Sequence, residues 1–259
     1  PTVATTQGVL PAFRWATPAG DAAKSSDAER FRSDHPEWFA ITVPPAEAGF
    51  RAATEWDESQ AVLVAYELNA AADLDIRETL IQIVAALARA TDVYVLCESA
   101  ELFDDLQAHL VASGLSATYR NRVHARLIPV ESIWCMDFGP LGLVGEDGTV
   151  AFLDFRYYAA RPLDDAVPTR LAADMGVDAY RAPLTLEGGN FQTDGEGVCF
   201  TTERALQDHT RDELAAALAS YAGCAELVVL RDIDDDLTGH IDMFFKLISP
   251  TVAILGQFE

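Results

Sequence analysis

The stretch Leu237-Thr-Gly-His240-Ile-Asp242-Met-Phe-Phe245 sets an imidazole and a carboxylate two residues apart in an otherwise apolar run. In an extended backbone, residues i and i+2 point to the same face, so His240 and Asp242 are expected to share a side. A histidine beside an acid places a proton carrier next to an anion, which is typical of an acid/base site. A core histidine satisfied by its neighbour explains this stretch equally well. The motifs upstream favour the acid/base site.

Two further polar motifs stand at a fixed distance upstream. Trp134-Cys-Met-Asp137 and Glu187-Gly-Gly-Asn190 each precede two apolar runs separated by a glycine-containing turn, which is typical of a β-hairpin. The spacing from Asp137 to Asn190 is 53 residues (190 − 137), and that from Glu187 to His240 is also 53 (240 − 187). The recurring order is strand, strand, helix, strand. A period near 50 residues predicts an α/β propeller or array whose units cannot bury their apolar faces alone.

Equivalent positions in a ring of such units converge on its axis, so the motifs predict one central pocket. Its expected side chains are Asp137, Glu187, Asn190, His240 and Asp242, with Trp134 as an apolar wall. Three crowded carboxylates repel one another unless they hold a cation. A catalytic zinc site usually has two or three His or Cys ligands, and only one histidine lies in these motifs. A planar guanidinium, which takes two carboxylates in bidentate pairs, fits better, so we expect no metal and no cofactor.

These motifs resemble the signature blocks of a known family, the bacterial peptidylarginine deiminases and agmatine deiminases. The blocks that carry the resemblance are Thr54-Glu-Trp-Asp-Glu58, Trp134-Cys-Met-Asp137-Phe-Gly-Pro140, Leu186-Glu-Gly-Gly-Asn-Phe191 with Asp194-Gly-Glu-Gly197, and Gly239-His-Ile-Asp-Met243. The resemblance implies the pentein fold, a ring of five ββαβ units. Residues 53–259 would form about three of the five units.

The resemblance also implies roles for the site residues. Asp137 and Asp242 would grip a substrate guanidinium, His240 would be the general acid/base, and Glu187 would assist. The implied reaction is hydrolysis of a peptidyl-arginine or a small guanidino compound to a ureido product and ammonia, through a cysteine thiouronium intermediate. The alternatives are an agmatine deiminase and a non-catalytic or degenerate pentein-type binding protein.

The chain departs from the family pattern in two ways. The family has arginine directly before the block's aspartate, whereas this chain has Met136. The family's nucleophile is a cysteine of the fifth unit, which the repeat places roughly 100 residues after Asp242, beyond Glu259. We therefore expect this chain to be the first three-fifths of an enzyme, inactive alone, with the remaining C-terminal units of the same protein as its partner.

None of the chain's own cysteines is expected to be the nucleophile. They show no CxxC pair and no metal-ligand spacing, so we interpret them as buried thiols, and nothing in their spacing supports a disulfide. Cys135 lies in the right block, but strand alternation would turn it away from Trp134 and Met136. The others lie in predicted scaffold strands: Cys97, Cys199 and Cys224.

The segment Asp154-Phe-Arg-Tyr-Tyr-Ala-Ala-Arg161-Pro-Leu-Asp-Asp165 bears on the substrate. It is short, as in the peptidylarginine branch of the family, whose arginines here clamp the substrate's terminal carboxylate. Arg161 fits one such position, and Ala159 occupies another. A surface salt bridge from Arg161 to a neighbouring aspartate is an equally good interpretation. We favour a peptidylarginine or free-guanidino deiminase.

Composition limits the partners. The 259 residues carry 41 acidic and 18 basic side chains, a net charge of −23, which repels nucleic acid and anionic membranes. This charge favours cationic partners, or it serves solubility alone. No apolar run approaches the roughly 18 residues of a membrane span. Residues 1–52 predict an extended N-terminal arm with a short helix near residues 26–33, before a deiminase domain over 53–259. The polar arm and the missing initial methionine favour a secreted or cell-envelope protein.

Overall fold

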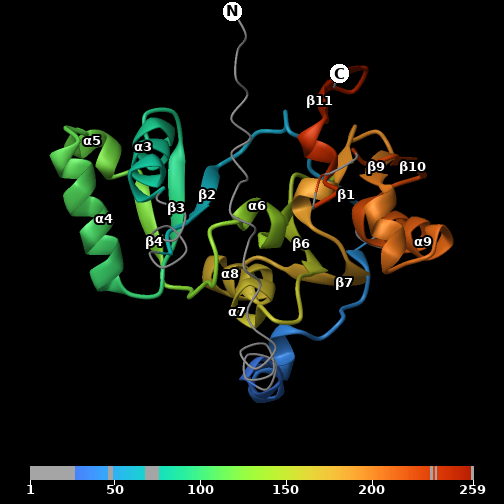
Figure 1. Ribbon diagram of the computed structural model, residues 1–259, viewed down its shortest axis with the longest axis horizontal. Helices are drawn as coiled ribbons and strands as arrows, with labels where there is room; N and C mark the ends of the chain where they lie inside the picture. The colour runs from blue at the N-terminus through green and yellow to red at the C-terminus, as the bar shows by residue number, and fades with distance from the viewer. Residues whose placement is uncertain (1–26, 46–48, 68–75, 234–235, 237, 258–259) are drawn as a thin grey trace, which may run out of the picture.

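The computed structural model describes residues 27–45, 49–67, 76–233, 236 and 238–257. These residues form a mixed α/β fold in which small sheets follow one another along the chain. Figure 1 shows the sheets side by side, the N-terminal ones on the left and the C-terminal ones on the right. The longer helices lie on the outside of this arrangement. The sequence prediction of an α/β fold built from small repeated sheets is consistent with it.

The first sheet is parallel throughout and is built by β2 (Ala61–Ala65), α3 (Arg77–Leu87), β3 (Asp92–Leu96), α4 (Ala100–Ala112), α5 (Ala117–Arg120) and β4 (Val123–Arg126). Strand β3 lies between β2 and β4 and pairs with both. Its apolar residues and those of the two longer helices form one core, in which Val84, Leu106 and Leu110 are fully buried. This segment therefore alternates strand and helix instead of beginning with a hairpin.

The second sheet contains β1 (Phe50–Ala52), α6 (Cys135–Phe138), β5 (Leu141–Gly145), β6 (Val150–Arg156), α7 (Pro162–Asp165), α8 (Val167–Met175) and β7 (Ala179–Thr185). The strand order is β1-β5-β6-β7, with an antiparallel β5–β6 hairpin and a parallel β6–β7 pair. Pro168 lies in the first turn of α8, and Gly176 follows it in the left-handed conformation at φ 70°. These residues fix the ends of the crossover helix between β6 and β7.

The third sheet repeats this order with η3 (Gly188–Asn190), β8 (Gln192–Thr193), β9 (Val198–Thr202), η4 (Glu203–Gln207), α9 (Arg211–Ala222) and β10 (Glu226–Leu230). Strands β8 and β9 form the hairpin, and β10 is parallel to β9. Thr202 caps η4, and α9 starts later because Thr210 and Glu213 form a capping box there.

A third hairpin follows a third short helix: η5 (Ile241–Met243), β11 (Phe245–Ser249) and β12 (Val252–Leu255). A short helix followed by a hairpin thus occurs three times, and the hairpin is followed by a helix and a parallel strand twice. This confirms the predicted strand, strand, helix, strand order for the second and third sheets. The number of units in a complete ring stays a prediction.

Part of the predicted N-terminal arm packs against the sheets. Residues 1–26 and 46–48 lie outside the described residues. The remainder contains a helix over residues 27–34, close to the predicted one, then η1 (Pro36–Trp38) and strand β1. The Arg170 guanidinium lies 4.8 Å from the centre of a Trp38 ring, and the Tyr221 hydroxyl donates to the Thr42 carbonyl at 2.6 Å. Residues 27–43 are therefore docked on α8 and α9, contrary to the expected extended arm.

Two of the four cysteines are bonded to each other. Cys199 in β9 and Cys224, directly after α9, form a disulfide that closes a loop of 25 residues in sequence separation. The expectation of four buried thiols is therefore wrong for this pair. The pairing arises because helix α9 returns the chain to the strand at which it left, with the two Cα atoms 5.6 Å apart. Cys97 and Cys135 remain thiols.

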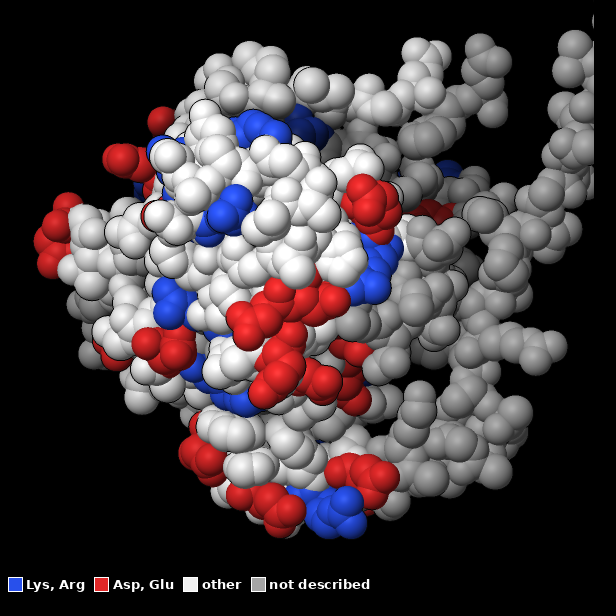
Figure 2. Space-filling model, turned by 90° about the vertical axis from the view of Figure 1, so that its left-hand side faces the viewer, with Lys and Arg blue, Asp and Glu red and all other residues white. Residues whose placement is uncertain are grey.

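Acidic side chains dominate the exterior. Figure 2 shows the face that carries the first sheet and its helices, where Asp and Glu gather in clusters with arginines between them. No helix among the described residues is long and apolar enough to cross a bilayer. The three short helices lie on the inner side of the arrangement, where η3 contacts both α6 and η5, and they carry the predicted polar motifs.

Candidate active site

The predicted acid/base residues come from the three short helices. Asp137 lies in α6, Glu187 directly precedes η3, and Asp242 lies in η5 with His240 at its N-terminus. The expectation that His240 and Asp242 share one face of an extended strand is wrong, because the backbone turns into a 3-10 helix. Gly239 at φ 64° starts that turn, where few other residues fit.

Gly189 marks the point on which these side chains converge. A methyl group at Gly189 would lie 2.6 Å from His240 Nδ1, 2.8 Å from Asp137 Oδ1 and 3.0 Å from Asp242 Oδ2. Its backbone N–H donates to Asp137 Oδ1 at 3.3 Å. Only glycine leaves room for the three polar groups. Their close approach to the backbone explains why the motif has glycine at position 189.

His240 and Glu187 form a hydrogen-bonded pair. His240 Nε2 is bonded to Glu187 Oε2, and His240 Nδ1 lies 3.6 Å from Asp137 Oδ1. Burial opposes a charge on the imidazole, but the Glu187 bond and the nearby carboxylates outweigh it and raise the His240 pKa above its ordinary value. Burial also opposes ionisation of Glu187, yet bonds from His240 and Tyr158 lower its pKa. The pair therefore favours imidazolium and carboxylate.

The other two carboxylates, Asp137 and Asp242, have raised pKa values. Burial, together with the negative charges of Glu187 and Asp242, raises the pKa of Asp137 to about 6, although His240 partly offsets this. Burial likewise raises the pKa of Asp242. Two carboxylates with raised pKa values are stabilised when a cation enters between them. Ligand atoms of Asp137, Glu187 and His240 lie within 4.8 Å of one another, a spacing that a metal ion also fits.

The Asn190 side chain connects the elements that carry the site residues. Its Oδ1 accepts hydrogen bonds from the Thr202 backbone N–H at 3.2 Å, the Thr202 hydroxyl at 3.0 Å and the Ile241 N–H at 3.2 Å. The side chain is buried and its oxygen is fully engaged by the protein. Asn190 was predicted to bind substrate, and the structure places its oxygen at the junction of η3, β9 and η5.

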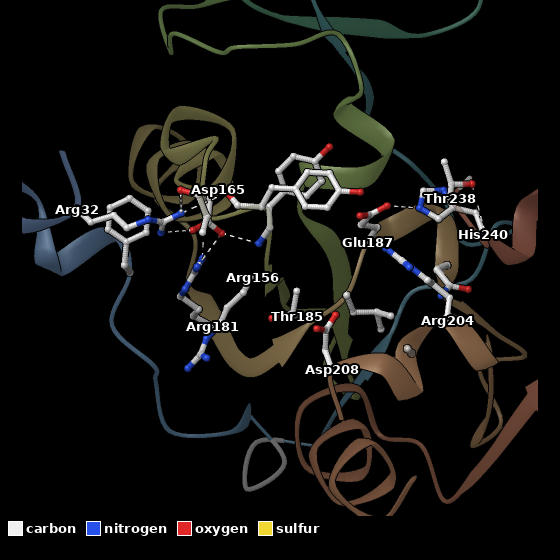
Figure 3. A pocket seen from close by; sticks show the side chains of 17 residues that line it. Arg32, Arg156, Asp165, Arg181, Thr185, Glu187, Arg204, Asp208, Thr238 and His240 are labelled. Carbon is white, nitrogen blue, oxygen red and sulfur yellow. Dashed lines mark hydrogen bonds and ion pairs between the residues drawn. The ribbon is translucent and has the colours of Figure 1, made fainter. Parts of the chain in front are cut away.

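A cavity of about 530 Å³ adjoins Glu187 and His240. Figure 3 shows this pair at one end of it and Arg32, Asp165 and Arg181 at the other. Its other walls come from the loop after β6 and from η4. No sequence pattern marks Arg32 or Arg204, because an isolated arginine near the end of a helix or strand cannot be told from a solvated one.

Two predicted residues lie elsewhere. Trp134 is exposed and is not among the described residues that line this cavity. Arg161 is also outside the lining, and its guanidinium lies 5.9 Å from the centre of the Tyr158 ring. The alternative interpretation of Arg161 was a salt bridge to Asp164 or Asp165. Asp165 pairs instead with Arg32 and Arg181, whereas the positive charge of Arg161 acts on Asp164 and favours its ionised form.

Comparison with known proteins agrees with this geometry. The family model for the Porphyromonas-type peptidyl-arginine deiminases matches residues 51–259. The chain belongs to this family. The family resemblance inferred from the motifs is therefore confirmed.

Relatives carry agmatine deiminase names. The putative agmatine deiminase of Shewanella frigidimarina is 28% identical over 239 residues, which cover 83% of this chain and 61% of the relative. That of Vibrio parahaemolyticus is 30% identical over 147 residues, 50% of this chain and 41% of the relative. The chain thus spans about three-fifths of the length of the Shewanella relative.

Solved structures share the fold. The agmatine deiminase of Enterococcus faecalis gives a TM-score of 0.71 at 20% identity, covering 83% of this chain and 62% of that one. The arginine deiminase from Porphyromonas gingivalis, itself named as putative, gives 0.63 at 23% identity, covering 77% and 63%. At these identities the likeness establishes the fold alone.

Proposed function

We propose that the protein hydrolyses a guanidinium group to a ureido group and ammonia, without a metal or cofactor. The observation that carries the proposal is the convergence of Asp137, His240 and Asp242 around Gly189. Two carboxylates that lie this close together can accept hydrogen bonds from the two edges of a planar guanidinium. The charged imidazole beside them supplies a proton donor.

The chemistry follows from the protonation states. Asp137 and Asp242 hold the substrate guanidinium charged, which leaves its central carbon electrophilic. A thiolate adds to that carbon, and the protonated His240 gives its proton to the departing nitrogen, which leaves as ammonia. The neutral His240 then takes a proton from water as the water attacks the thiouronium carbon. The thiolate leaves, the hydroxyl of the adduct loses its proton to solvent, and the ureido product is released. Glu187 stabilises His240 whenever it carries the proton.

We place the nucleophilic cysteine outside these 259 residues, because each cysteine of this chain is engaged elsewhere. Cys199 and Cys224 are bonded to each other. The Cys135 thiol donates to the Leu63 carbonyl at 3.3 Å, and burial raises its pKa to about 11. Burial also raises the pKa of Cys97 to about 11. A buried neutral thiol is a poor nucleophile.

The substrate is proposed to be a peptidyl-arginine or a free guanidino compound, with Trp134, Asn190 and Arg161 near its non-reacting part. An agmatine deiminase is the alternative within the family, favoured by the relatives' names. A non-catalytic guanidinium-binding protein is favoured by the lack of a reactive thiol among the described cysteines. A metal hydrolase fits less well, because Glu187 already occupies His240 Nε2.

The test is ammonia and ureido-product release by the full-length protein with agmatine, free arginine and an arginine-containing peptide. We expect turnover by the parent and a loss of 10²-fold or more in His240→Ala, since general acid/base catalysis contributes about 10²–10⁴-fold. The 259-residue chain alone is expected to bind these compounds without releasing ammonia. Equal turnover in His240→Ala, or turnover that disappears with a chelator, contradicts the proposal.

A further inference from the structure

The N-terminal segment forms part of the wall beside the acid/base pair. The family model matches the chain from residue 51 onward, whereas residues 27–43 are docked on α8 and α9. From this segment, Arg32 and Phe39 line the cavity that adjoins Glu187 and His240. Figure 3 shows Arg32 at the end of that cavity opposite His240. A segment outside the family match therefore contributes side chains next to the site.

The Arg32 side chain is held in place by its own segment and by the elements around it. Its guanidinium lies 4.5 Å from the centre of the Phe39 ring, and 26% of the side chain is exposed. Further along the segment, the Thr42 N–H donates to the Arg181 carbonyl at 3.2 Å, and the Thr42 carbonyl accepts from the Tyr221 hydroxyl at 2.6 Å. These contacts tie the segment to β7 and α9, so the guanidinium has a defined position.

Arg32 holds the loop that follows β6. One terminal nitrogen, Nη1, donates to Asp165 Oδ2, and the other, Nη2, donates to the carbonyl oxygens of Tyr158 and Ala159 at 3.4 Å each. Asp165 in turn accepts from the Tyr157 N–H at 2.7 Å through its other carboxylate oxygen. The backbone of this loop is thus fixed by Arg32 directly and through Asp165.

Tyr158 connects the loop to the acid/base pair. Its hydroxyl is hydrogen-bonded to Glu187, and Glu187 Oε2 is bonded to His240 Nε2. Burial and the neighbouring carboxylate raise the pKa of Tyr158 above its ordinary value, so the hydroxyl keeps its proton and is the donor. A continuous series of contacts therefore leads from the Arg32 guanidinium, through the backbone and side chain of Tyr158, to the His240 ring.

Neutralising Asp165 does not by itself require Arg32. Arg181 already pairs with Asp165 at 2.7 Å, and its side chain is more deeply buried than that of Arg32. The carbonyl contacts of Arg32 are additional, and one of them is to Tyr158, whose side chain meets Glu187. Arg32 is therefore placed to act on the loop rather than on the charge of Asp165 alone.

We propose that Arg32 is a positioning residue, which holds the Tyr158 hydroxyl against Glu187 and thereby orients His240. A hydrogen bond from Tyr158 restricts rotation of the Glu187 carboxylate, and the carboxylate sets the direction of the His240 ring. This inference rests on the proposed function and extends it to a residue at the opposite end of the cavity from His240.

A double-mutant cycle on the full-length protein tests the inference. Arg32→Gln and Tyr158→Phe should each lower kcat on the order of 10- to 100-fold, because a small misplacement of catalytic groups has an effect of that size. Since Arg32 acts through Tyr158, the double variant should lose little more than Tyr158→Phe alone. KM for the guanidino compound should change little, because Asp137 and Asp242 stay in place.

Arg30→Gln is the matched control. It removes the same charge two residues earlier, where the exposed Arg30 pairs with Asp27 at 3.1 Å, and it should leave kcat unchanged. Circular dichroism gives the unfolding midpoint of each variant. Should Arg32→Gln not fold, Arg32→Lys replaces it. An ammonium keeps the charge opposite Asp165 but lacks the planar geometry that reaches both carbonyl oxygens, so this variant should fold and still lose kcat.

The outcomes separate this inference from the proposed function. Unchanged kcat in Arg32→Gln, or losses that multiply in the double variant, would overturn the inference. If the parent releases no ammonia, the proposed function fails instead, and NMR spectra of the 259-residue protein decide on the inference. The His240 ring signals, identified by their absence in His240→Ala, should shift in Arg32→Gln and in Tyr158→Phe but not in Arg30→Gln. Identical His240 signals in Arg32→Gln and the parent overturn it without reference to turnover.

Discussion

The site depends on the absence of a side chain at Gly189, because atoms of three site residues lie within 3.0 Å of where its Cβ would be. We predict that Gly189→Ala abolishes binding of guanidino compounds by pushing His240 and Asp137 apart, while the fold is retained. Binding is measured by calorimetry and folding by circular dichroism.

The control for that substitution is Gly148→Ala in the β5–β6 turn. Gly148 has φ 83° and no atom within 4 Å of the added methyl. It should cost about 1 kcal/mol of stability through backbone strain and leave binding intact. If Gly189→Ala binds like the parent, the three side chains do not enclose the substrate.

Asp137 gives the site a pH dependence of known sign. Its pKa of about 6 in the empty site means that the carboxylate is protonated below that pH and must lose its proton to hold a guanidinium. We predict that affinity for agmatine or arginine is constant above pH 7 and falls as the pH drops below about 6, approaching tenfold per pH unit. Calorimetry in buffers of different ionisation enthalpy also detects the released proton.

The raised pKa of Asp137 also affects the stability of the ligand-free protein, and here the pH dependence is opposite to that of ligand affinity. A carboxyl group whose pKa is higher folded than unfolded binds more protons in the folded state. Its contribution to the free energy of unfolding therefore rises as the pH falls from about 6 toward 4. Asp137→Asn should remove both effects. A parent whose affinity is flat down to pH 4.5 contradicts this role of Asp137.

At the scale of elements, the disulfide links β9 to the end of the crossover helix α9 in the third sheet. Cys199 in β9 and Cys224 after α9 close a loop of 25 residues in sequence separation. Opening it by Cys199→Ser with Cys224→Ser should lower the free energy of unfolding by about 3 kcal/mol. Chemical denaturation measures the change.

Reductant supplies the control for the disulfide. It should lower the stability of the parent and leave the double variant unchanged. Identical denaturation midpoints for the oxidised parent and the double variant would show that the crossover does not need the bond.

The sequence periodicity predicted the order of the helices and strands, but not their local backbone geometry. Glycine-containing turns predicted the hairpins, and the 53-residue spacing predicted that Asp137, Glu187 and His240 lie close together. The spacing could not show that the motifs are short helices, because that depends on Gly239 adopting a positive φ and on contacts between distant segments. The disulfide could not be predicted either, since α9 returns Cys224 to β9 only in the folded chain.

Several site residues were beyond sequence reasoning for a related reason. Asn190 lies in a polar motif and lines the cavity, but the motif could not show that its oxygen accepts hydrogen bonds from Thr202 and Ile241. Arg204 stands in no motif, and its charge helps to lower the pKa of Glu187. Both facts are properties of neighbours that lie far apart in the sequence.

At the scale of the whole molecule, the net charge of −23 and the carboxylates of the site both favour a cationic ligand. Under the proposed function, the net negative charge raises the local concentration of cations, and the carboxylates of the three short helices bind the guanidinium.

Calorimetric titration of arginine, with lysine as the matched cation, tests the central claim most directly. The account predicts that the protein binds arginine and not lysine, because only a planar guanidinium spans Asp137 and Asp242, and that Asp137→Asn combined with Asp242→Asn abolishes this binding. Equal binding of lysine, or undiminished arginine binding by the double variant, would contradict it.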